Sequence, residues 1–129
     1  MYLPISLATA AAAAGINIWL SMRIGSLRQQ KKISVGDGGD EALIRRMRAQ
    51  ANFIENVPIL IVLVALIELA RPMNVYLAAV AAVFTLGRVA HGLGMDGGVW
   101  KQGRMVGTLT TMLSLLGLAV WAVTIAIDM

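Results

Sequence analysis

The chain has 129 residues, of which 58% are hydrophobic and 14% charged, with a formal net charge of +4. Soluble domains contain about 45–50% apolar residues, so this composition favours a membrane protein. The chain has no cysteine and one histidine, which together with scattered carboxylates do not make a zinc or haem site. The positive charge favours contact with anionic lipid. It is weak evidence for nucleic-acid binding, because a membrane protein of this kind has no soluble domain with a basic surface.

Four apolar segments each approach or exceed the roughly 20 residues that a helix needs to cross a bilayer. In chain order they are Leu3–Met22, Ala49–Ala70, Val75–Leu93 and Met105–Ile127. Short connections join them, so the segments take up nearly the whole chain. We therefore predict an all-α fold, an integral membrane four-helix bundle that forms a single domain over residues 1–129.

The first segment has one feature of a secretory signal peptide, because Ala8-Thr9-Ala10 resembles a cleavage site. A signal peptide begins with basic residues and has a shorter apolar core. Here no Lys or Arg comes before the segment, and the apolar run continues to Met22. We therefore expect a retained membrane helix.

The second segment begins with charged residues that share one face of a helix. They fall within an arc of about 80° at 3.6 residues per turn. Placing a charge in lipid costs about 2.5–3.5 kcal/mol on insertion scales, so this face should contact protein or water. The residues on it are Arg45, Arg48, Asn52 and Glu55.

Two of the connections carry most of the basic residues and several glycines. The positive-inside rule therefore places the first and third connections in the cytoplasm and both termini outside. Asp40 ends the first connection, where it can cap the second helix. Gly92–Gly97 matches the G-x-G-x-x-G pattern, but no strand precedes it, so we interpret it as a helix end and a loop.

The rise of 1.5 Å per residue predicts that three helices bring polar side chains to one depth. With Glu68 and Arg71 at the outer boundary, this layer lies about 5–10 Å inside the inner edge of the hydrocarbon. Glu55 and Arg88 could form a structural ion pair in it, or could bind a ligand. A lone histidine such as His91 is more often a packing or hydrogen-bonding residue than a ligand. The expected layer comprises Arg48, Asn52, Glu55, Arg88, His91 and Arg104.

A basic, partly buried pocket of this kind suits an anion with more than one acidic group, because guanidinium groups bind carboxylates in pairs of hydrogen bonds. Glu55 would add a partner for a ligand ammonium group, and Asn52 a neutral hydrogen-bonding group. A small zwitterionic peptide with additional carboxylates fits this set. The adjoining apolar helices could hold a greasy second molecule.

The stretch Arg48-Ala49-Gln50-Ala51-Asn52-Phe53, followed by Glu55 and Pro58, resembles the signature of the membrane-associated proteins in eicosanoid and glutathione metabolism, the MAPEG superfamily. The resemblance extends along nearly the whole chain. It implies a homotrimer of four-helix subunits, with glutathione bound as a co-substrate between neighbouring subunits and with no metal. The matching residues of the third and fourth helices are Arg88, His91, Arg104 and Gly107.

The resemblance also implies roles for individual residues. An arginine at the start of the fourth helix stabilises the glutathione thiolate in such enzymes, and Arg104 matches it. A free thiol has a pKa of about 8.5, and a nearby guanidinium favours the thiolate. Arg45, Arg88 and Asn56 are expected to support the binding residues. The residues expected to contact glutathione are Arg48, Gln50, Asn52, Glu55, His91 and, at the end of the first helix, Arg28.

Two departures from the family pattern bear on the substrate. Eicosanoid-producing members carry tyrosine where this chain has Asn56 and His91, which argues against a leukotriene-type substrate. We therefore expect a bacterial-type member in the bacterial inner membrane, resembling microsomal glutathione transferase. It would conjugate glutathione to hydrophobic electrophiles, with hydroperoxide reduction as an additional reaction.

The expected partners are further copies of the chain, glutathione, a hydrophobic electrophile or lipid, and the membrane lipids, with no nucleic acid. Two alternatives stay open. One is a non-catalytic lipid-binding or scaffold member of the same superfamily. The other is a small transporter or assembly subunit whose polar layer is only structural.

Overall fold

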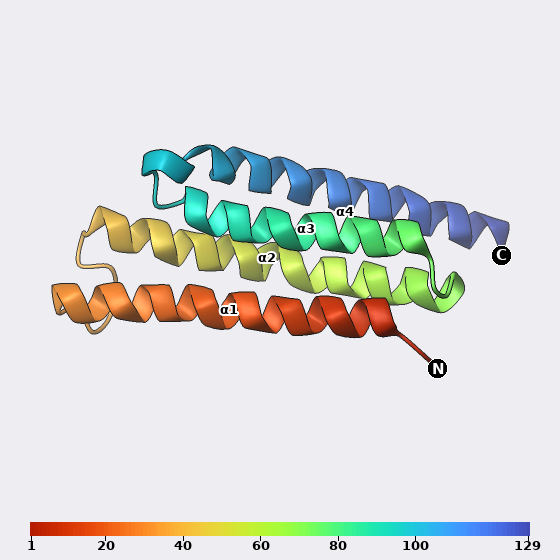
Figure 1. The fold of residues 1–129 in the computed structure, drawn as a ribbon, viewed down its shortest axis with the longest axis horizontal. Helices are drawn as coiled ribbons and strands as arrows, with labels where there is room; N and C mark the ends of the chain where they lie inside the picture. The colour runs from red at the N-terminus through yellow and green to blue at the C-terminus, as the bar shows by residue number, and fades with distance from the viewer.

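The computed structural model describes all 129 residues and consists of four long helices with one short 3-10 turn (Figure 1). The prediction of an all-α fold with four membrane-length helices is confirmed. Two helices are longer than their apolar cores, because charged residues with good helix propensity extend them. The elements are α1 (Pro4–Lys31), α2 (Glu41–Ala70), α3 (Val75–Gly94), η1 (Gly98–Trp100) and α4 (Gln102–Asp128).

Successive helices run in opposite directions along the bundle (Figure 1). The α1–α2 and α3–α4 connections lie together at one end, which we call the basic end. Both termini and the α2–α3 turn lie at the opposite end (Figure 1). The two connections that the positive-inside rule assigns to one side of the membrane therefore do share one end of the molecule.

Helices α2 and α3 each begin at a polar cap formed by the residue that precedes the helix. Asp40 accepts a hydrogen bond of 2.9 Å from the backbone N–H of Leu43, which confirms the cap predicted for α2. Helix α1 has no cap from the residue that precedes it. Instead the fully buried carboxylate of Glu68, on α2, accepts hydrogen bonds from the backbone N–H groups of Ile5, at 2.9 Å, and Ser6, at 2.8 Å. Glu68 therefore ties the end of α2 to the start of α1.

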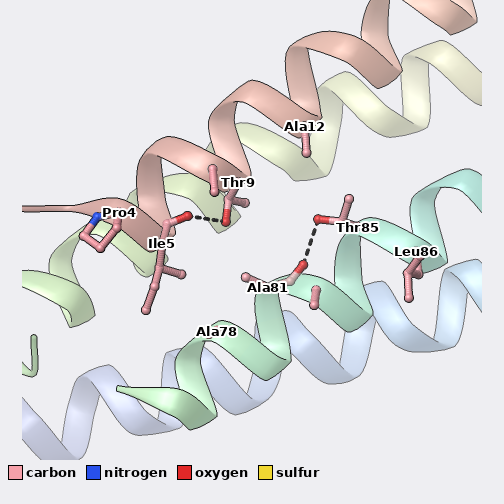
Figure 2. A pocket seen from close by; sticks show the side chains of 10 residues that line it. Pro4, Ile5, Thr9, Ala12, Ala78, Ala81, Thr85 and Leu86 are labelled. Atoms are coloured by element: carbon pink, nitrogen blue, oxygen red, sulfur yellow. Dashed lines mark hydrogen bonds between the residues drawn. The ribbon is translucent and has the colours of Figure 1, made fainter. Parts of the chain in front are cut away.

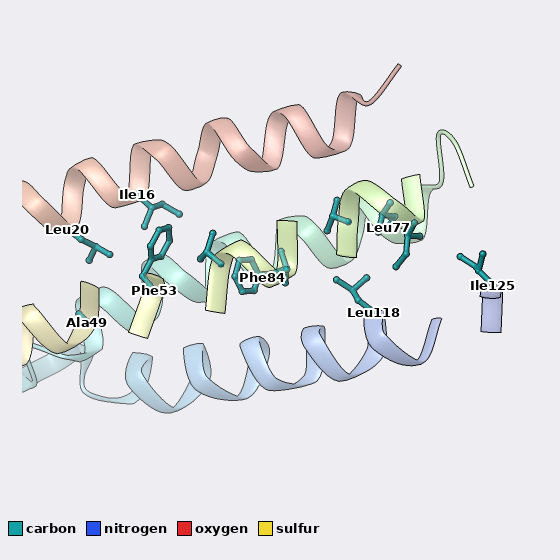
Figure 3. Packing of buried hydrophobic residues seen from close by; sticks show 12 residues of the cluster. Ile16, Leu20, Ala49, Phe53, Leu77, Phe84, Leu118 and Ile125 are labelled. Carbon is teal, nitrogen blue, oxygen red and sulfur yellow. The ribbon is translucent and has the colours of Figure 1, made fainter. Parts of the chain in front are cut away.

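One side of α2 forms the centre of the hydrophobic core (Figure 3). Its buried residues recur every three or four positions, which places them on a single face. Ile16 and Leu20 of α1, and Phe84 of α3, pack against that face in the same cluster. Only this one face of α2 is covered within the subunit. The core residues of α2 are Ala49, Phe53, Val57, Leu60, Val64 and Ile67.

Helices α3 and α4 approach each other closely because glycines line their contact. A Cβ atom added at Gly107 would lie 2.3 Å from the Cβ of His91 and 2.6 Å from the carbonyl oxygen of Gly87. One added at Gly103 would lie 2.3 Å from the carbonyl oxygen of Ala90. Small residues of this kind let membrane helices pack backbone to backbone.

We predict that Gly107→Ala destabilises the protein by about 1–3 kcal/mol, because the added methyl group forces α3 and α4 apart. Gly117→Ala on the same helix is the matched control, since a Cβ atom there has no neighbour within 4 Å. That control should be neutral or stabilising by up to about 1 kcal/mol. Thermal unfolding of both variants in detergent measures the difference, and equal Tm values would contradict the close contact.

Candidate functional site

Arg88 is the centre of a polar layer that joins three helices. Its side chain lies on α3 and is 2% exposed. Nη2 donates a hydrogen bond of 2.7 Å to Oδ1 of Asn52 on α2, and Nη1 donates one of 3.0 Å to Oγ1 of Thr111 on α4. Nη2 also lies 3.4 Å from Nδ1 of His91. Of the residues predicted for one layer, the structure therefore brings Asn52, Arg88 and His91 together, and the α4 residue that joins them is Thr111 and not the predicted Arg104.

The structure does not form the ion pair between Glu55 and Arg88 that the sequence left open. Arg88 bonds to the neutral groups of Asn52 and Thr111, while Glu55 lies further round α2 and is exposed. The Nε atom of Arg88 is buried without a hydrogen-bond partner. The guanidinium charge at the centre of the layer thus has no carboxylate beside it within the subunit.

The other polar residues predicted on α2 form an exposed row beside the core-forming face. Arg48 and Glu55 are both exposed, and Asn52 between them is partly buried. Towards the opposite end of the bundle the same row becomes apolar, with Ile59 and Val62 more than half exposed. A single subunit therefore leaves both charged and apolar side chains of one membrane helix uncovered.

Gln50 points to the other side of α2, towards α1. Its Nε2 donates a hydrogen bond of 2.6 Å to Oγ of Ser21 and lies 3.4 Å from Oδ1 of Asn17. Two residues at 100° each place Arg48 and Gln50 about 160° apart around the helix. The residues expected at one binding site are thus divided between two sides of the subunit.

Arg28 and Asn56 contact backbone groups. Nη1 of Arg28 donates to the carbonyl oxygens of Gly36, at 2.6 Å, and Ile33, at 3.4 Å, so it holds the α1–α2 connection. Nδ2 of Asn56 donates at 2.8 Å to the carbonyl oxygen of Asn52, one turn earlier in α2. In the subunit these two side chains support the backbone around the predicted site.

Arg104 is exposed at the start of α4, on the same side of the bundle as the charged end of α2. It lines a cavity of about 200 Å³ together with Arg45 of α2 and Lys101 of the connection before α4. Arg45 also forms an ion pair of 2.9 Å with Glu41. The structure therefore brings the predicted catalytic residue next to two further cations.

Sequence reasoning missed a cluster that fixes the α3–α4 connection. Asp96 pairs with Arg23 of α1 and, at 3.2 Å, with Nε of Arg46 of α2. Nη1 of Arg46 also donates at 2.7 Å to the carbonyl oxygen of Arg23. Asp96 is the one acidic residue between α3 and α4, among surrounding basic side chains, and this was the signal available in the sequence.

The largest cavity of the subunit lies away from the polar layer, between α1 and α3 near the termini (Figure 2). It has a volume of about 530 Å³, and half of its lining residues are alanine. The hydroxyl groups of Thr9 and Thr85 bond to the carbonyl oxygens of Ile5, at 2.7 Å, and Ala81, at 2.8 Å, of their own helices (Figure 2). None of the predicted site residues lines this cavity, so it is not the predicted site.

We predict that Arg88→Ala lowers the Tm more than any exposed arginine substitution. The change removes the donors to Asn52 and Thr111, and each buried group left unpaired costs about 1–3 kcal/mol. Arg88→Lys should be intermediate, because one ammonium group cannot match the planar guanidinium fork. Arg71→Ala, in the exposed α2–α3 turn, is the control and should change stability by less than about 0.5 kcal/mol. Equal stability of all these variants would show that the layer does not hold the helices together.

The similarity of this chain to a known protein family extends over almost the whole bundle. No curated protein matches the chain. A model of the MAPEG family matches residues 6–124, a span that reaches into all four helices and contains every residue of the candidate site. The chain therefore belongs to the MAPEG family, as its helix-two motif and the arrangement of its polar residues indicated.

Proposed function

We propose that the protein is a membrane glutathione transferase, which joins the sulfur atom of glutathione to hydrophobic electrophiles dissolved in the bilayer. Membership of the MAPEG family supports a role in this general area of metabolism. The observation that carries the proposal is the excess of positive charge in and beside the polar layer. Arg48, Arg88 and Arg104 lie near this level, and none of them forms an ion pair within the subunit.

Glutathione has the groups that this set of side chains can bind. It is a tripeptide with two carboxylates, one ammonium group and one thiol. Arg48 can hold a carboxylate, the amide of Asn52 can donate a further hydrogen bond, and Glu55 can accept from the ammonium group. Arg88 donates to Oδ1 of Asn52, which leaves the amide nitrogen of that side chain to donate to a ligand. His91 reaches the layer only beside Arg88, where it is buried.

The reaction follows from the charge of Arg104. A guanidinium beside the sulfur stabilises the thiolate over the thiol, and the thiolate is the nucleophile. Its electron pair forms a bond to the electrophilic carbon, while the leaving group departs with the electrons of the broken bond. With a hydroperoxide, the thiolate instead attacks the terminal oxygen and breaks the O–O bond, which releases an alcohol and leaves the sulfenic acid of glutathione. The thiol of a second glutathione then displaces water from that sulfur and forms the disulfide. Hydroperoxide reduction is therefore the additional activity that we propose.

The divided placement of the binding residues supports a site between copies of the chain. Arg48 and Glu55 are exposed on one side of α2, and Gln50 faces α1 on the other. Charged side chains facing lipid would be costly, which favours a neighbouring subunit over that face. We propose a homotrimer in the bacterial inner membrane, with the basic end towards the cytoplasm, where glutathione enters.

Arg104→Ala should abolish the thiolate and lower the rate of conjugation by about 100-fold or more, since electrostatic stabilisation of this kind is a large term. Glutathione binding should stay measurable by calorimetry, because the α2 residues remain. The ultraviolet absorbance of the thiolate and the reaction with an activated aryl chloride measure the two effects. Arg71→Ala, which removes the same charge at the opposite end, is the control. Failure of the unaltered protein to bind glutathione or to lower its thiol pKa would overturn the proposal.

Mixed oligomers test whether the site lies between subunits. Arg48→Ala and Gln50→Ala should each weaken glutathione binding when present in every copy. Co-expression of the two variants should restore some sites, because one copy then supplies Arg48 and its neighbour supplies Gln50. Light scattering should give particles of three 13.7 kDa chains. Binding no better than the mean of the two variants would place the site within one subunit.

A further inference from the structure

We propose that the protein binds the phosphate group of an anionic phospholipid at its basic end, in the cavity between α2 and the start of α4. This cavity has a volume of about 200 Å³. Arg45, Lys101 and Arg104 supply its charged walls, and Gly94, Met95 and Gly97 complete the lining. The inference goes beyond the proposed transferase activity, with which it shares Arg104, and it rests on this cavity and on the surface around it.

The charge of the cavity suits a phosphate group. Its three cations come from three separate elements, and no acidic residue is among the lining residues. Glu41 pairs with Arg45 at 2.9 Å, but Lys101 and Arg104 have no carboxylate partner. Several cations around one small space bind a phosphate through charge-assisted hydrogen bonds to its oxygens.

The walls of the cavity are held in place by close packing. A Cβ atom at Gly94 would lie 2.0 Å from the backbone nitrogen of Arg104, so the end of α3 touches the start of α4 directly. Gly97 has a φ of +79°, and a Cβ atom there would lie 3.4 Å from Nη1 of Arg45. Asp96 anchors the same connection to α1 and α2. The cations therefore converge on a cavity that the backbone has already shaped.

The surface next to the cavity indicates that the phosphate belongs to a lipid. Val99 and Trp100, directly before Lys101, are 93% and 64% exposed. Exposed indole and apolar groups at the end of a membrane helix are typical of the headgroup level. Met105 and Leu109 then continue an exposed apolar face along α4, where an acyl chain can lie. Basic pockets between membrane helices are known to take anionic lipid headgroups.

This site is separate from the proposed glutathione site, although the two are neighbours. Arg48, Asn52 and Glu55, which we assign to glutathione, do not line the cavity. Arg104 is common to both assignments, and Arg45 is also expected to support the glutathione site. Lys101 therefore distinguishes the lipid site best, and Arg45 is the second residue to change.

Native mass spectrometry of the full-length protein tests the proposal. The protein is released from detergent that contains equal amounts of phosphatidylglycerol and phosphatidylcholine, and the bound lipid is counted. We expect phosphatidylglycerol to be retained preferentially. Lys101→Gln and Arg45→Gln should each lower its retention about five-fold, the usual effect of one cation near a lipid surface. Lys101→Arg should restore it.

Lys32→Gln is the matched control, because Lys32 is an exposed cation at the same end but does not line the cavity. An equal loss in this control would mean that the basic end attracts anionic lipid only in general, and would overturn the site. Equal retention of the two lipids would do the same. Glycerol phosphate binding as tightly as phosphatidylglycerol would assign the cavity to a soluble anion. Displacement of the lipid by glutathione would show that the cavity belongs to the glutathione site, whereas loss of glutathione binding alone would leave the lipid site intact.

Discussion

The guanidinium group of Arg88 is the constraint on which the polar half of this bundle depends. A buried arginine in a membrane protein needs acceptors for its N–H groups, and Nη1 and Nη2 of Arg88 find them on α4 and α2, while Nε has no partner within the subunit. The two hydrogen bonds set the relative height of three helices. The glycine contact between α3 and α4 is what allows this, since Gly107 brings α4 against the turn of α3 that carries His91. The close packing of α3 on α4 and the hydrogen bonds of Arg88 therefore favour the same alignment of the helices.

The same constraint explains why α2 has two very different faces. One face fills the core with a regular apolar series from Ala49 to Ile67. The other carries Arg48 and Glu55 at a depth where lipid is a poor neighbour. One face of α2 is therefore buried within its own subunit, and the sequence of the other face is suited to contact with a second molecule. A ligand with fixed charges gains specificity there, because each charged group of the site is otherwise left without a partner.

The bundle could be predicted from the sequence, but only part of the site could. The length and periodicity of the apolar segments determine the four helices, and helical rise alone places Asn52, Arg88 and His91 at one depth. The helical rise predicts how far along the bundle a residue lies, however, and not which neighbouring helix its side chain faces. It could not show that Arg88 would bond to Asn52 and not to Glu55. These two residues of α2 lie at similar depths and differ in their angle around the helix. Nor could it show that Gln50 faces α1, or that Glu68 caps α1, since both contacts depend on which helix lies beside α2.

Asp96 shows how a contact at the surface can control the chemistry proposed in the layer. Its carboxylate bridges arginines of α1 and α2, so the short connection before α4 is held against the bundle instead of projecting from it. Lys101 and Arg104 follow on that connection, and their positions are fixed with it. A phosphate bound in the cavity would place negative charge close to Arg104 and would oppose the stabilisation of a neighbouring thiolate by the same guanidinium. Binding free energies couple reciprocally, so a thiolate at Arg104 would weaken the hold on the lipid to the same extent. Arg45 and Lys101 reduce this competition, because they provide positive charge for the phosphate in addition to that of Arg104.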